Sequence, residues 1–249
     1  KLDDIDVFAD HLVMYERENG LRTLQVRHFE SGEEHRVDFP EPVYTFSQAS
    51  NPEFQTHTLR FTYMSLTTPD SVFDYDMFTR TRELKKQNPV LGGFHADDYQ
   101  SERVFGMAQD GTQIPISLVY KKGLVRDGSH PCVLYGYGSY GVSMEPGFAS
   151  TRLSLLERGF VYAIAHIRGG EEMGRYWYDQ GKLLNKANTF TDFIVCGETL
   201  IARKYTSSDT LAIMGGSAGG LLIGADAFFN SRIKQLTTLT ARHALPTVS

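Results

Sequence analysis

The sequence predicts an all-β segment over residues 1–98, followed by an α/β domain over residues 99–249. In the first part, short runs with alternating apolar and polar residues are separated by turns. After residue 99, short apolar runs alternate with helical segments, the βαβ pattern of a parallel sheet. The chain has 249 residues, 41% apolar and 22% charged, which suits one large or two small domains and excludes a disordered chain.

Charge and cysteine content exclude several classes of protein. The 25 Lys and Arg against 30 Asp and Glu give a net charge of -5, so neither nucleic acid nor an anionic membrane is an expected partner. The longest apolar stretch, residues 159–165, is far shorter than the roughly 20 residues of a bilayer span. Cys132 and Cys196 cannot build a disulfide framework, which indicates reduced thiols and a cytoplasmic location.

The chain opens on Lys1 without a signal peptide, and we expect a fragment.

The first part is predicted to contain strands in series, for example residues 11–15, 23–29 and 57–63. A weak self-similarity at an offset of 49 residues is close to the period of roughly 40 to 50 residues of propeller blades. Two propeller blades would fit this offset, and an ordinary β-sandwich or meander fits it equally well. The related positions are Leu24, Val26 and Phe29 against Phe73, Tyr75 and Phe78.

The second part begins with a hairpin signal at Asp110-Gly111. A helix is predicted from an Asn188 cap, with Asp192 in its early turns, where a negative charge favours the helix dipole. Its apolar face would pack on the sheet through Phe190, Phe193, Ile194, Gly197, Leu200 and Ile201. The predicted strands, short and apolar enough to be buried on both faces, are residues 116–120, 132–135, 160–167 and 211–214.

One serine has the surroundings of a nucleophile. Ser217 lies in Gly-Gly-Ser-Ala-Gly-Gly, after the apolar strand 211–214 and before a small-residue segment that suits a helix. This is the pattern of a nucleophile elbow, in which glycines permit a strained bend and the close approach of strand and helix. The backbone amide of Ala218 would then face a developing oxyanion. A purely structural glycine-rich turn is the alternative, whereas a phosphate loop lacks the required Lys-Ser/Thr.

Two other predicted strands end in glycine-rich segments. In residues 135–141 a tyrosine hydroxyl would donate to the oxyanion, or the segment is an aromatic loop covering the sheet edge. In residues 166–174, Glu171 and Glu172 are interpreted as solvated surface rather than a cation site. His166 lies within an apolar strand and is interpreted as a core histidine rather than a general base.

These segments together resemble the prolyl oligopeptidase family of serine peptidases. The resemblance rests on Tyr-Gly-Tyr-Gly-Ser-Tyr-Gly at 135–141, Ile-Arg-Gly-Gly-Glu-Glu-Met-Gly at 167–174, Asn-Thr-Phe-Thr-Asp-Phe at 188–193 and Gly-Gly-Ser-Ala-Gly-Gly at 215–220. Within the family, residues 65–70, 116–120 and 152–164 look most like the oligopeptidase B branch. The similarity runs from about residue 5 to about residue 225.

The resemblance implies a seven-bladed propeller capping an α/β-hydrolase domain, with the last blades in residues 1–98 and the N-terminal portion of the catalytic domain in residues 99–249. It implies hydrolysis of short peptides after Lys or Arg, with no metal or organic cofactor. Carried over by position, Ser217 is the nucleophile, and the Tyr137 hydroxyl and Ala218 amide are the oxyanion donors. Glu145 matches one acid of a pair that helps to hold a basic side chain, whereas Gly147 replaces the other.

The sequence departs from the family after Ser217. The family's catalytic Asp and His lie further downstream than this chain extends. Asp226 is nine residues on, about 13 Å along a helix, and the surroundings of His243 do not match the family's histidine loop. We therefore expect the 249-residue chain to be inactive alone. The alternatives are a non-catalytic remnant, or a prolyl-specific or acyl-peptide-releasing member of the same family.

Overall fold

The computed structural model describes residues 1–216, which form two compact units. The first unit comprises Lys1–Ala96 together with Glu145–Ser150. The second comprises Asp97–Met144 and the chain from Thr151 onward. Each unit has its own buried core.

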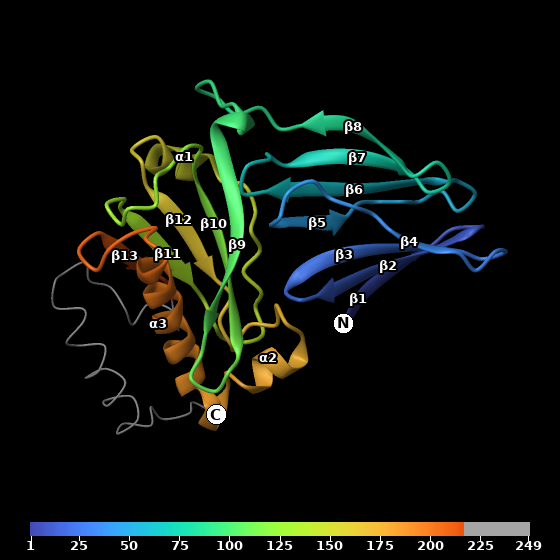
Figure 1. Ribbon diagram of the computed structural model, residues 1–249. Coiled ribbons are helices and arrows are strands. Elements are labelled where there is room, and N and C mark those ends of the chain that lie inside the picture. Colours follow the sequence, from blue (N-terminus) through green and yellow to red (C-terminus); the bar gives the residue numbers. More distant parts are fainter. Residues whose placement is uncertain (217–249) are drawn as a thin grey trace. The chain divides into compact units, whose positions relative to one another are not determined.

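The first unit contains two four-stranded antiparallel sheets (Figure 1). Their strand orders are β1-β2-β3-β4 and β5-β6-β7-β8, so every strand pairs with its neighbour in sequence. The strands predicted near residues 11, 23 and 57 are therefore present. The bounds are Leu2–Val7 (β1), His11–Glu18 (β2), Leu21–His28 (β3), Glu34–Arg36 (β4), Tyr44–Gln48 (β5), Thr58–Ser65 (β6), Ser71–Asp76 (β7) and Thr81–Gln87 (β8).

The self-similarity in the sequence corresponds to equivalent strands of the two sheets. Leu24 and Val26 lie on β3, Phe73 and Tyr75 lie on β7, and each strand is the third of its sheet. All four side chains belong to or pack against the core between the sheets. The repeated structural unit is thus a four-stranded antiparallel sheet, as the 49-residue offset predicts for propeller blades.

Aromatic rings dominate the core of the first unit. The Phe39 ring stacks on those of Phe46 and Tyr63, with centroids 5.2 and 5.0 Å apart. Phe61 on β6 is fully buried and lies in stacked contact with Phe73 on β7. Along β2, alternate residues are buried, as expected for a strand with one face on the core. The outermost strand β8 is exposed along its whole length.

The second unit is built on a five-stranded mixed sheet of order β13-β11-β12-β10-β9 (Figure 1). β11 runs parallel to both β12 and β13, while β10 runs antiparallel to β9 and β12. The four predicted strands and the hairpin at Asp110-Gly111 are confirmed. The bounds are Tyr99–Met107 (β9), Gln113–Lys121 (β10), Cys132–Gly136 (β11), Val161–Ala165 (β12) and Leu211–Met214 (β13).

Helix α3 packs on this sheet with a face that matches the predicted one in part. Phe193, Gly197 and Leu200 are buried as predicted, whereas Phe190, Ile194 and Ile201 are only half-buried. The buried face also contains Thr189, Asp192 and Cys196, and a Cβ on Gly106 of β9 would lie only 2.9 Å from Val195. The α-helices span Ser150–Leu156 (α1), Arg175–Asp179 (α2) and Ala187–Ala202 (α3), and short 3-10 helices span Ala96–Asp98 (η1) and Leu183–Asn185 (η2).

The predicted cap of α3 is wrong. The helix begins at Ala187, and Lys186 rather than Asn188 is its N-cap residue. The side-chain amide of Asn188 instead donates to the carbonyl oxygen of Gln180 at 2.9 Å, so it fastens the preceding loop.

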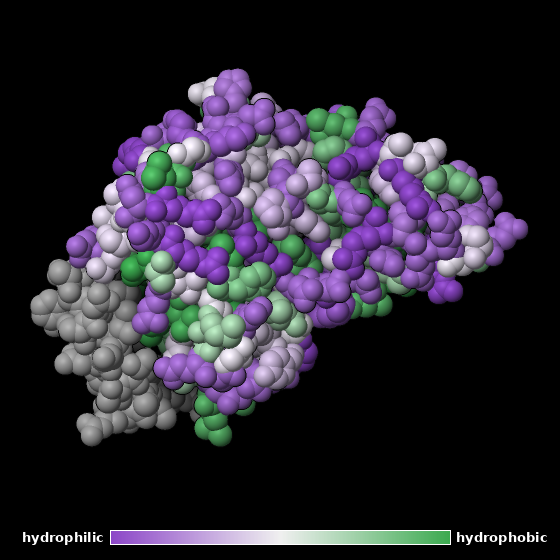
Figure 2. Space-filling model, viewed as in Figure 1, coloured by the Kyte–Doolittle hydropathy of each residue, from purple (hydrophilic) through white to green (hydrophobic). Residues whose placement is uncertain are grey.

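The surface is largely polar. Figure 2 shows hydrophilic residues over most of the viewed face, with apolar residues in small groups between them. Among residues 1–216, no helix has both the length and the apolar character to cross a bilayer.

Candidate active site

The predicted nucleophile follows directly after the described part of the chain. β13 ends at Met214, and Gly215 and Gly216 continue from it toward Ser217. The buried-type strand that a nucleophile elbow requires before the serine is therefore present. Ser217 and Ala218 lie outside the described residues, so the bend, the following helix and both roles stay predictions.

Tyr137 lies at the same edge of the sheet as the approach to Ser217. Tyr135 on β11 pairs with Met214 on β13, and these are the last partners of a parallel pair. Tyr137 and Gly216 each stand two residues beyond those partners, at the carboxyl ends of adjacent strands. Within residues 1–216 the Tyr137 hydroxyl makes no hydrogen bond, and the side chain is half-buried. Ligands of such sheets bind beyond the carboxyl ends of the strands, and the role of Tyr137 as an oxyanion donor stays a prediction.

The loops after β11 and β12 pack backbone against backbone. A Cβ on Gly169, which has a φ of +105°, would lie 2.1 Å from the carbonyl oxygen of Gly138. A Cβ on Gly181 would lie 2.1 Å from the amide nitrogen of Gly169. Side chains at these positions would separate the loops, so both glycines are needed for close approach, and Gly169 also for its left-handed conformation.

Helix α3 fastens the same two loops through its first turn. The Thr189 hydroxyl donates to the carbonyl oxygen of Arg168 at 2.7 Å. The Lys186 ammonium donates to the carbonyl oxygen of Gly138 and, at 2.6 Å, to the hydroxyl of Ser139. Burial lowers the pKa of Lys186 to about 8. The segment that carries Tyr137 is therefore held by side chains far along the sequence.

A buried ion pair joins the loop after β12 to α3. Arg168 donates to Asp192 from Nη2 at 2.6 Å and from Nε at 2.8 Å, and its backbone amide donates to the same carboxylate at 3.0 Å. A further bond, 2.5 Å long, joins Arg168 to Asp110 of the β9–β10 turn. Burial disfavours the charged form of Arg168, but the hydrogen bonds to Asp192 and Asp110 favour that form more strongly. The net effect is a raised pKa of the Arg168 guanidinium. Hydrogen bonding to Arg168 lowers the pKa of Asp110 to about 2.

His166 is a core histidine, as predicted. It is 3% exposed, and its Nε2 shares a hydrogen bond of 2.7 Å with the hydroxyl of Ser117 on β10. The interpretation of Glu171 and Glu172 as solvated surface is wrong for Glu172, which is 1% exposed. Its Oε1 accepts from the backbone amide of Met144 at 2.8 Å and lies 3.8 Å from Nδ1 of His166. Glu172 therefore anchors the far end of the loop that follows Tyr137.

Glu145, the predicted subsite residue, belongs to the first unit. Its carboxylate forms an ion pair with Arg17 on β2, whose side chain is 5% exposed, and a longer contact of 3.4 Å with Nε of Arg22 on β3. A basic substrate side chain would have to share this carboxylate with both arginines. Gly147, at the position of the family's second acid, lies against Met64, because a Cβ there would meet its sulfur at 2.7 Å. The role of Glu145 stays a prediction.

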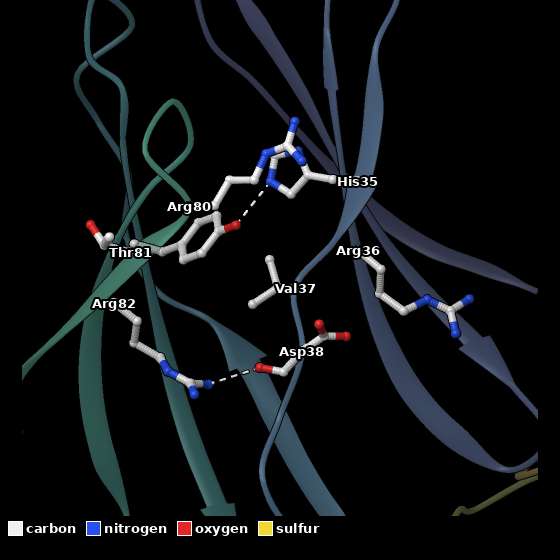
Figure 3. Close-up of a pocket in the computed structure, with 8 residues that line it drawn as sticks. His35, Arg36, Val37, Asp38, Arg80, Thr81 and Arg82 are labelled. Carbon is white, nitrogen blue, oxygen red and sulfur yellow. Dashed lines mark hydrogen bonds between the residues drawn. The ribbon is translucent and has the colours of Figure 1, made fainter.

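A separate cavity of about 590 Å³ lies within the first unit (Figure 3). Its cationic side chains are already engaged: Arg36 pairs with Glu18, Arg80 pairs with Glu33, and Arg82 donates to the carbonyl oxygen of Asp38 at 3.1 Å. The wall contains no serine or cysteine, and among the described residues no group of three or more His, Cys, Asp or Glu is arranged to bind a metal ion. The carboxyl ends of β11 and β13 remain the candidate active site.

Comparison with known proteins assigns the chain to a family. A model of the prolyl oligopeptidase family matches residues 146–233, and a model of the N-terminal β-propeller domain of prolyl oligopeptidase matches residues 1–88. The chain belongs to the prolyl oligopeptidase family. The first unit is part of the family's β-propeller, and the second is the start of its α/β-hydrolase domain, so the predicted fold class is confirmed.

Relatives cover nearly the whole of this chain. Dipeptidyl aminopeptidase BI of Pseudoxanthomonas mexicana is 48% identical over 225 residues, which are 90% of this chain and 31% of that protein. Protease 2 of Moraxella lacunata is 41% identical over 226 residues, 91% of this chain and 32% of that protein. The structure of oligopeptidase B from Leishmania major is 40% identical with a TM-score of 0.79, covering 88% of this chain and 32% of that one. The chain thus spans about a third of the length of these relatives.

Sequence reasoning missed the side chains that hold the loops. No sequence pattern points to Lys186 or Thr189 as residues that hold the loops, and the helix pattern predicts that Asp192 acts on the helix dipole, whereas it pairs with Arg168. One signal was available, since Arg168, Lys186 and Asp192 are charged residues at the end of an apolar strand and at the start of an amphipathic helix. Such charges are rarely buried unless they are paired.

Proposed function

We propose that the protein containing this chain is a serine oligopeptidase that hydrolyses short peptides through an acyl-enzyme on Ser217. One observation supports this most strongly: in a member of this family, β13 leads into Gly215 and Gly216, directly before Ser217 in the sequence, and Tyr137 follows the end of the adjacent strand β11 at the same edge of the sheet. The Ser217 oxygen attacks the scissile carbonyl while a histidine takes its proton and an aspartate orients that histidine. The Tyr137 hydroxyl and the Ala218 amide donate to the oxyanion of the tetrahedral intermediate.

Labelling of the full-length protein with a fluorophosphonate tests this assignment. A covalent adduct on Ser217, lost in Ser217→Ala together with peptidase activity, is the expected result. An active enzyme with no adduct on Ser217 would refute the assignment. Ser139, the nearby serine whose hydroxyl accepts a hydrogen bond from Lys186, is an internal control that should remain unlabelled.

The proposed substrates are short peptides with Lys or Arg before the cleaved bond. This specificity is supported by the likeness to structures of oligopeptidase B, including the one from Trypanosoma brucei with covalently bound antipain, at 41% identity and a TM-score of 0.79. In this chain only Glu145 is positioned by sequence to help hold a basic side chain, and it already pairs with Arg17. Glu145→Gln should therefore raise KM for substrates with a second basic residue by a small factor.

A prolyl-specific or dipeptide-releasing activity is the competing proposal. Its support is the identity to dipeptidyl aminopeptidase BI and to the prolyl endopeptidase of Elizabethkingia meningoseptica, 41% identical over 167 residues, which are 67% of this chain and 23% of that protein. Profiling the full-length enzyme with matched peptides that carry Arg, Lys or Pro before the cleaved bond separates the two proposals. Faster cleavage after Pro, or release of dipeptides from a free amino terminus, would replace the basic specificity.

We propose that the 249-residue chain is inactive by itself. A serine without its base is a poor nucleophile, and loss of triad members costs about 10⁴ to 10⁶ in rate. Neither Asp226 nor His243 stands in a segment like the family's catalytic Asp and His loops. Turnover of a basic dipeptide ester by this chain, abolished by Ser217→Ala, would overturn this proposal.

A cytoplasmic location is proposed from the thiols. Cys132 and Cys196 are both free and buried, and burial raises the pKa of each. Such thiols act as apolar core residues rather than as disulfide partners. Fractionation of cells that produce the full-length protein, with detection in the periplasmic or secreted fraction, would contradict the proposal.

A further inference from the structure

Lys186 occupies an unusual electrostatic position beneath the loop that carries Tyr137. It stands between η2 and α3, and its ammonium reaches the segment just after β11. Its hydrogen-bond acceptors are the carbonyl oxygen of Gly138, the Ser139 hydroxyl at 2.6 Å and the Thr189 hydroxyl at 3.2 Å. An ammonium has three protons, so these three acceptors use its full donor capacity.

All three acceptors are uncharged. Among residues 1–216, Lys186 forms no ion pair, whereas the neighbouring Lys182 pairs with Asp179 at 2.5 Å. A half-buried ammonium without a counterion is costly, and its energy is recovered here only through hydrogen bonds to the loop and to α3. The side chain therefore does not serve a surface ion pair; its hydrogen bonds are all directed at the Tyr137 loop and at the first turn of α3.

We propose that Lys186 is a positioning residue for the oxyanion site: its protonated side chain fixes Gly138 and Ser139, and thereby holds the adjacent Tyr137 hydroxyl in place at the carboxyl end of β11. This inference rests on the proposed function, because Tyr137 is taken as an oxyanion donor. Gly138 follows Tyr137 directly, so displacement of its carbonyl rotates the backbone next to the tyrosine. A displacement of about 1 Å at a reacting group can reduce the rate about 10²-fold.

The position of Lys186 also makes this support sensitive to pH. Burial lowers the pKa of its ammonium to about 8, and a cavity of about 350 Å³ beside it gives solvent access for proton exchange. The titratable side chains facing that cavity are Lys182, Tyr140 and Tyr178, with Asp179 paired to Lys182. The neutral amine has one donor fewer, so one of the three bonds to the loop and α3 is lost as the pH rises above about 8.

Activity and stability should respond to this titration with opposite signs. An unfolded lysine, with a pKa of 10.5, binds more protons than the folded protein between about 8 and 10.5. The free energy of unfolding therefore rises with pH over that window, whereas the support of Tyr137 weakens. A fall in kcat above about pH 8 without loss of folded protein would distinguish positioning from general stabilisation.

The test measures kcat and KM of the full-length enzyme on a short peptide from about pH 6 to about pH 10, on either side of the lysine titration, for the wild type, Lys186→Met, Lys186→Arg and the control Lys182→Met. Lys186→Met should lower kcat about 10²-fold with KM nearly unchanged. Lys186→Arg should recover part of kcat at neutral pH and lose the decline near pH 8, because guanidinium stays charged. Lys182→Met should behave as the wild type. An unchanged kcat in Lys186→Met, or the same alkaline decline in Lys186→Arg, overturns the proposal.

A double-mutant cycle locates the effect. Tyr137→Phe alone should lower kcat about 10²- to 10³-fold, and adding Lys186→Met should then lower it much less than in the wild type. Equal effects of Lys186→Met in both backgrounds would show that Lys186 does not act through Tyr137. If Lys186→Met fails to fold, the pH profiles of the wild type and Lys186→Arg still decide. Retention of activity in Ser217→Ala would instead refute the proposed function, independently of Lys186.

Discussion

The two units of this chain place their charges differently. In the first unit, arginines such as Arg60 and Arg36 pair with carboxylates while about half of each arginine side chain remains exposed. In the second unit, Arg168 and Asp192 pair at 2% and 0% exposure. Arg17, which pairs with Glu145, is the buried exception in the first unit. The second unit also has exposed pairs, such as Lys121 with Glu157, but its most deeply buried pair is the one that joins a loop to helix α3.

This difference follows from what each unit has to position. The blades bury aromatic rings between two sheets, and neighbouring strands in sequence supply their hydrogen bonds. The second unit must hold the irregular loops after β11 and β12, whose backbone groups have no strand partner. Charged side chains such as Asp192 and Lys186 satisfy these groups from a distance in sequence. The arrangement raises the cost of losing any one partner, because the other is left buried and unpaired.

Asp192→Asn should have the largest effect on stability. It removes the fully buried partner of Arg168 and leaves only the half-exposed Asp110 to pair with it; breaking a buried pair costs about 3 to 5 kcal/mol, of which Asp110 offsets a part. Native-state hydrogen exchange of the full-length protein should show reduced protection of the backbone amides in α3 and in the loop after β12. Asp110→Asn is the matched control, since Asp110 is half-exposed and the Arg168–Asp192 pair persists. Equal protection in Asp192→Asn and wild type would contradict the role given to buried charge.

Phe61→Leu should destabilise the blades by about 1 to 3 kcal/mol. The Phe61 ring is fully buried and contacts the rings of Phe39, Phe46 and Phe73 at centroid distances of 5.9 to 6.4 Å. The substitution keeps an apolar side chain but removes the ring contacts. Hydrogen exchange in β6 measures the change, and Phe54→Leu at an exposed position is the control. Reduced protection of the backbone amides in α3 rather than in β6 would show that the stabilities of the two cores are not independent.

His11 should make the stability of the blades sensitive to acid. Burial, and then repulsion from His28 and His57, lowers its pKa, while Asp10 opposes and His35 adds to the shift. The unfolded chain takes up this proton near pH 6.5, so stability is complete above that pH and falls as the pH drops below it. The slope for one proton is at most about 1.4 kcal/mol per pH unit. Unfolding midpoints in urea on either side of pH 6.5 measure it.

The control for this prediction is His11→Leu. His11 is 2% exposed, its Nδ1 has no hydrogen-bond partner among the described residues, and its ring lies 5.3 Å from that of Phe78. An apolar replacement therefore removes the titration while keeping the packing. The variant should lose much of the acid sensitivity, and a slope identical to that of the wild type would assign the sensitivity to other groups.

Local patterns in the sequence were sufficient for the strands and for part of the buried face of α3. Alternation along β2 and the apolar runs of β11, β12 and β13 reflect burial that each segment shows by itself. The 49-residue offset likewise relates β3 to β7 through the sequence pattern within each strand, and detecting it requires no knowledge of contacts between distant residues. These elements could be predicted because each depends on the residues within it.

The support of the candidate site could not be predicted in the same way. Lys186 and Gly138, or Arg168 and Asp192, are brought together only by the fold, and no local pattern states which charge meets which loop. Asparagine is a good N-cap residue, so the sequence predicts a cap at Asn188, yet the Asn188 amide donates to the carbonyl oxygen of Gln180 instead. The partners of the polar side chains therefore depend on tertiary contacts, whereas the positions of the strands and helices follow from the spacing of apolar residues.

Asp74→Asn should have the smallest effect, and it completes the comparison. Asp74 accepts two hydrogen bonds from Arg60, at 2.7 and 2.8 Å, across the exposed face of β6 and β7. The Arg60 bond lowers the pKa of Asp74, but Arg60 is half-exposed, so water replaces the lost partner. Hydrogen exchange in β6 and β7 at neutral pH should remain close to that of the wild type. A loss of protection comparable with that in Asp192→Asn would mean that the geometry of an ion pair, rather than its burial, determines its contribution to stability in this protein.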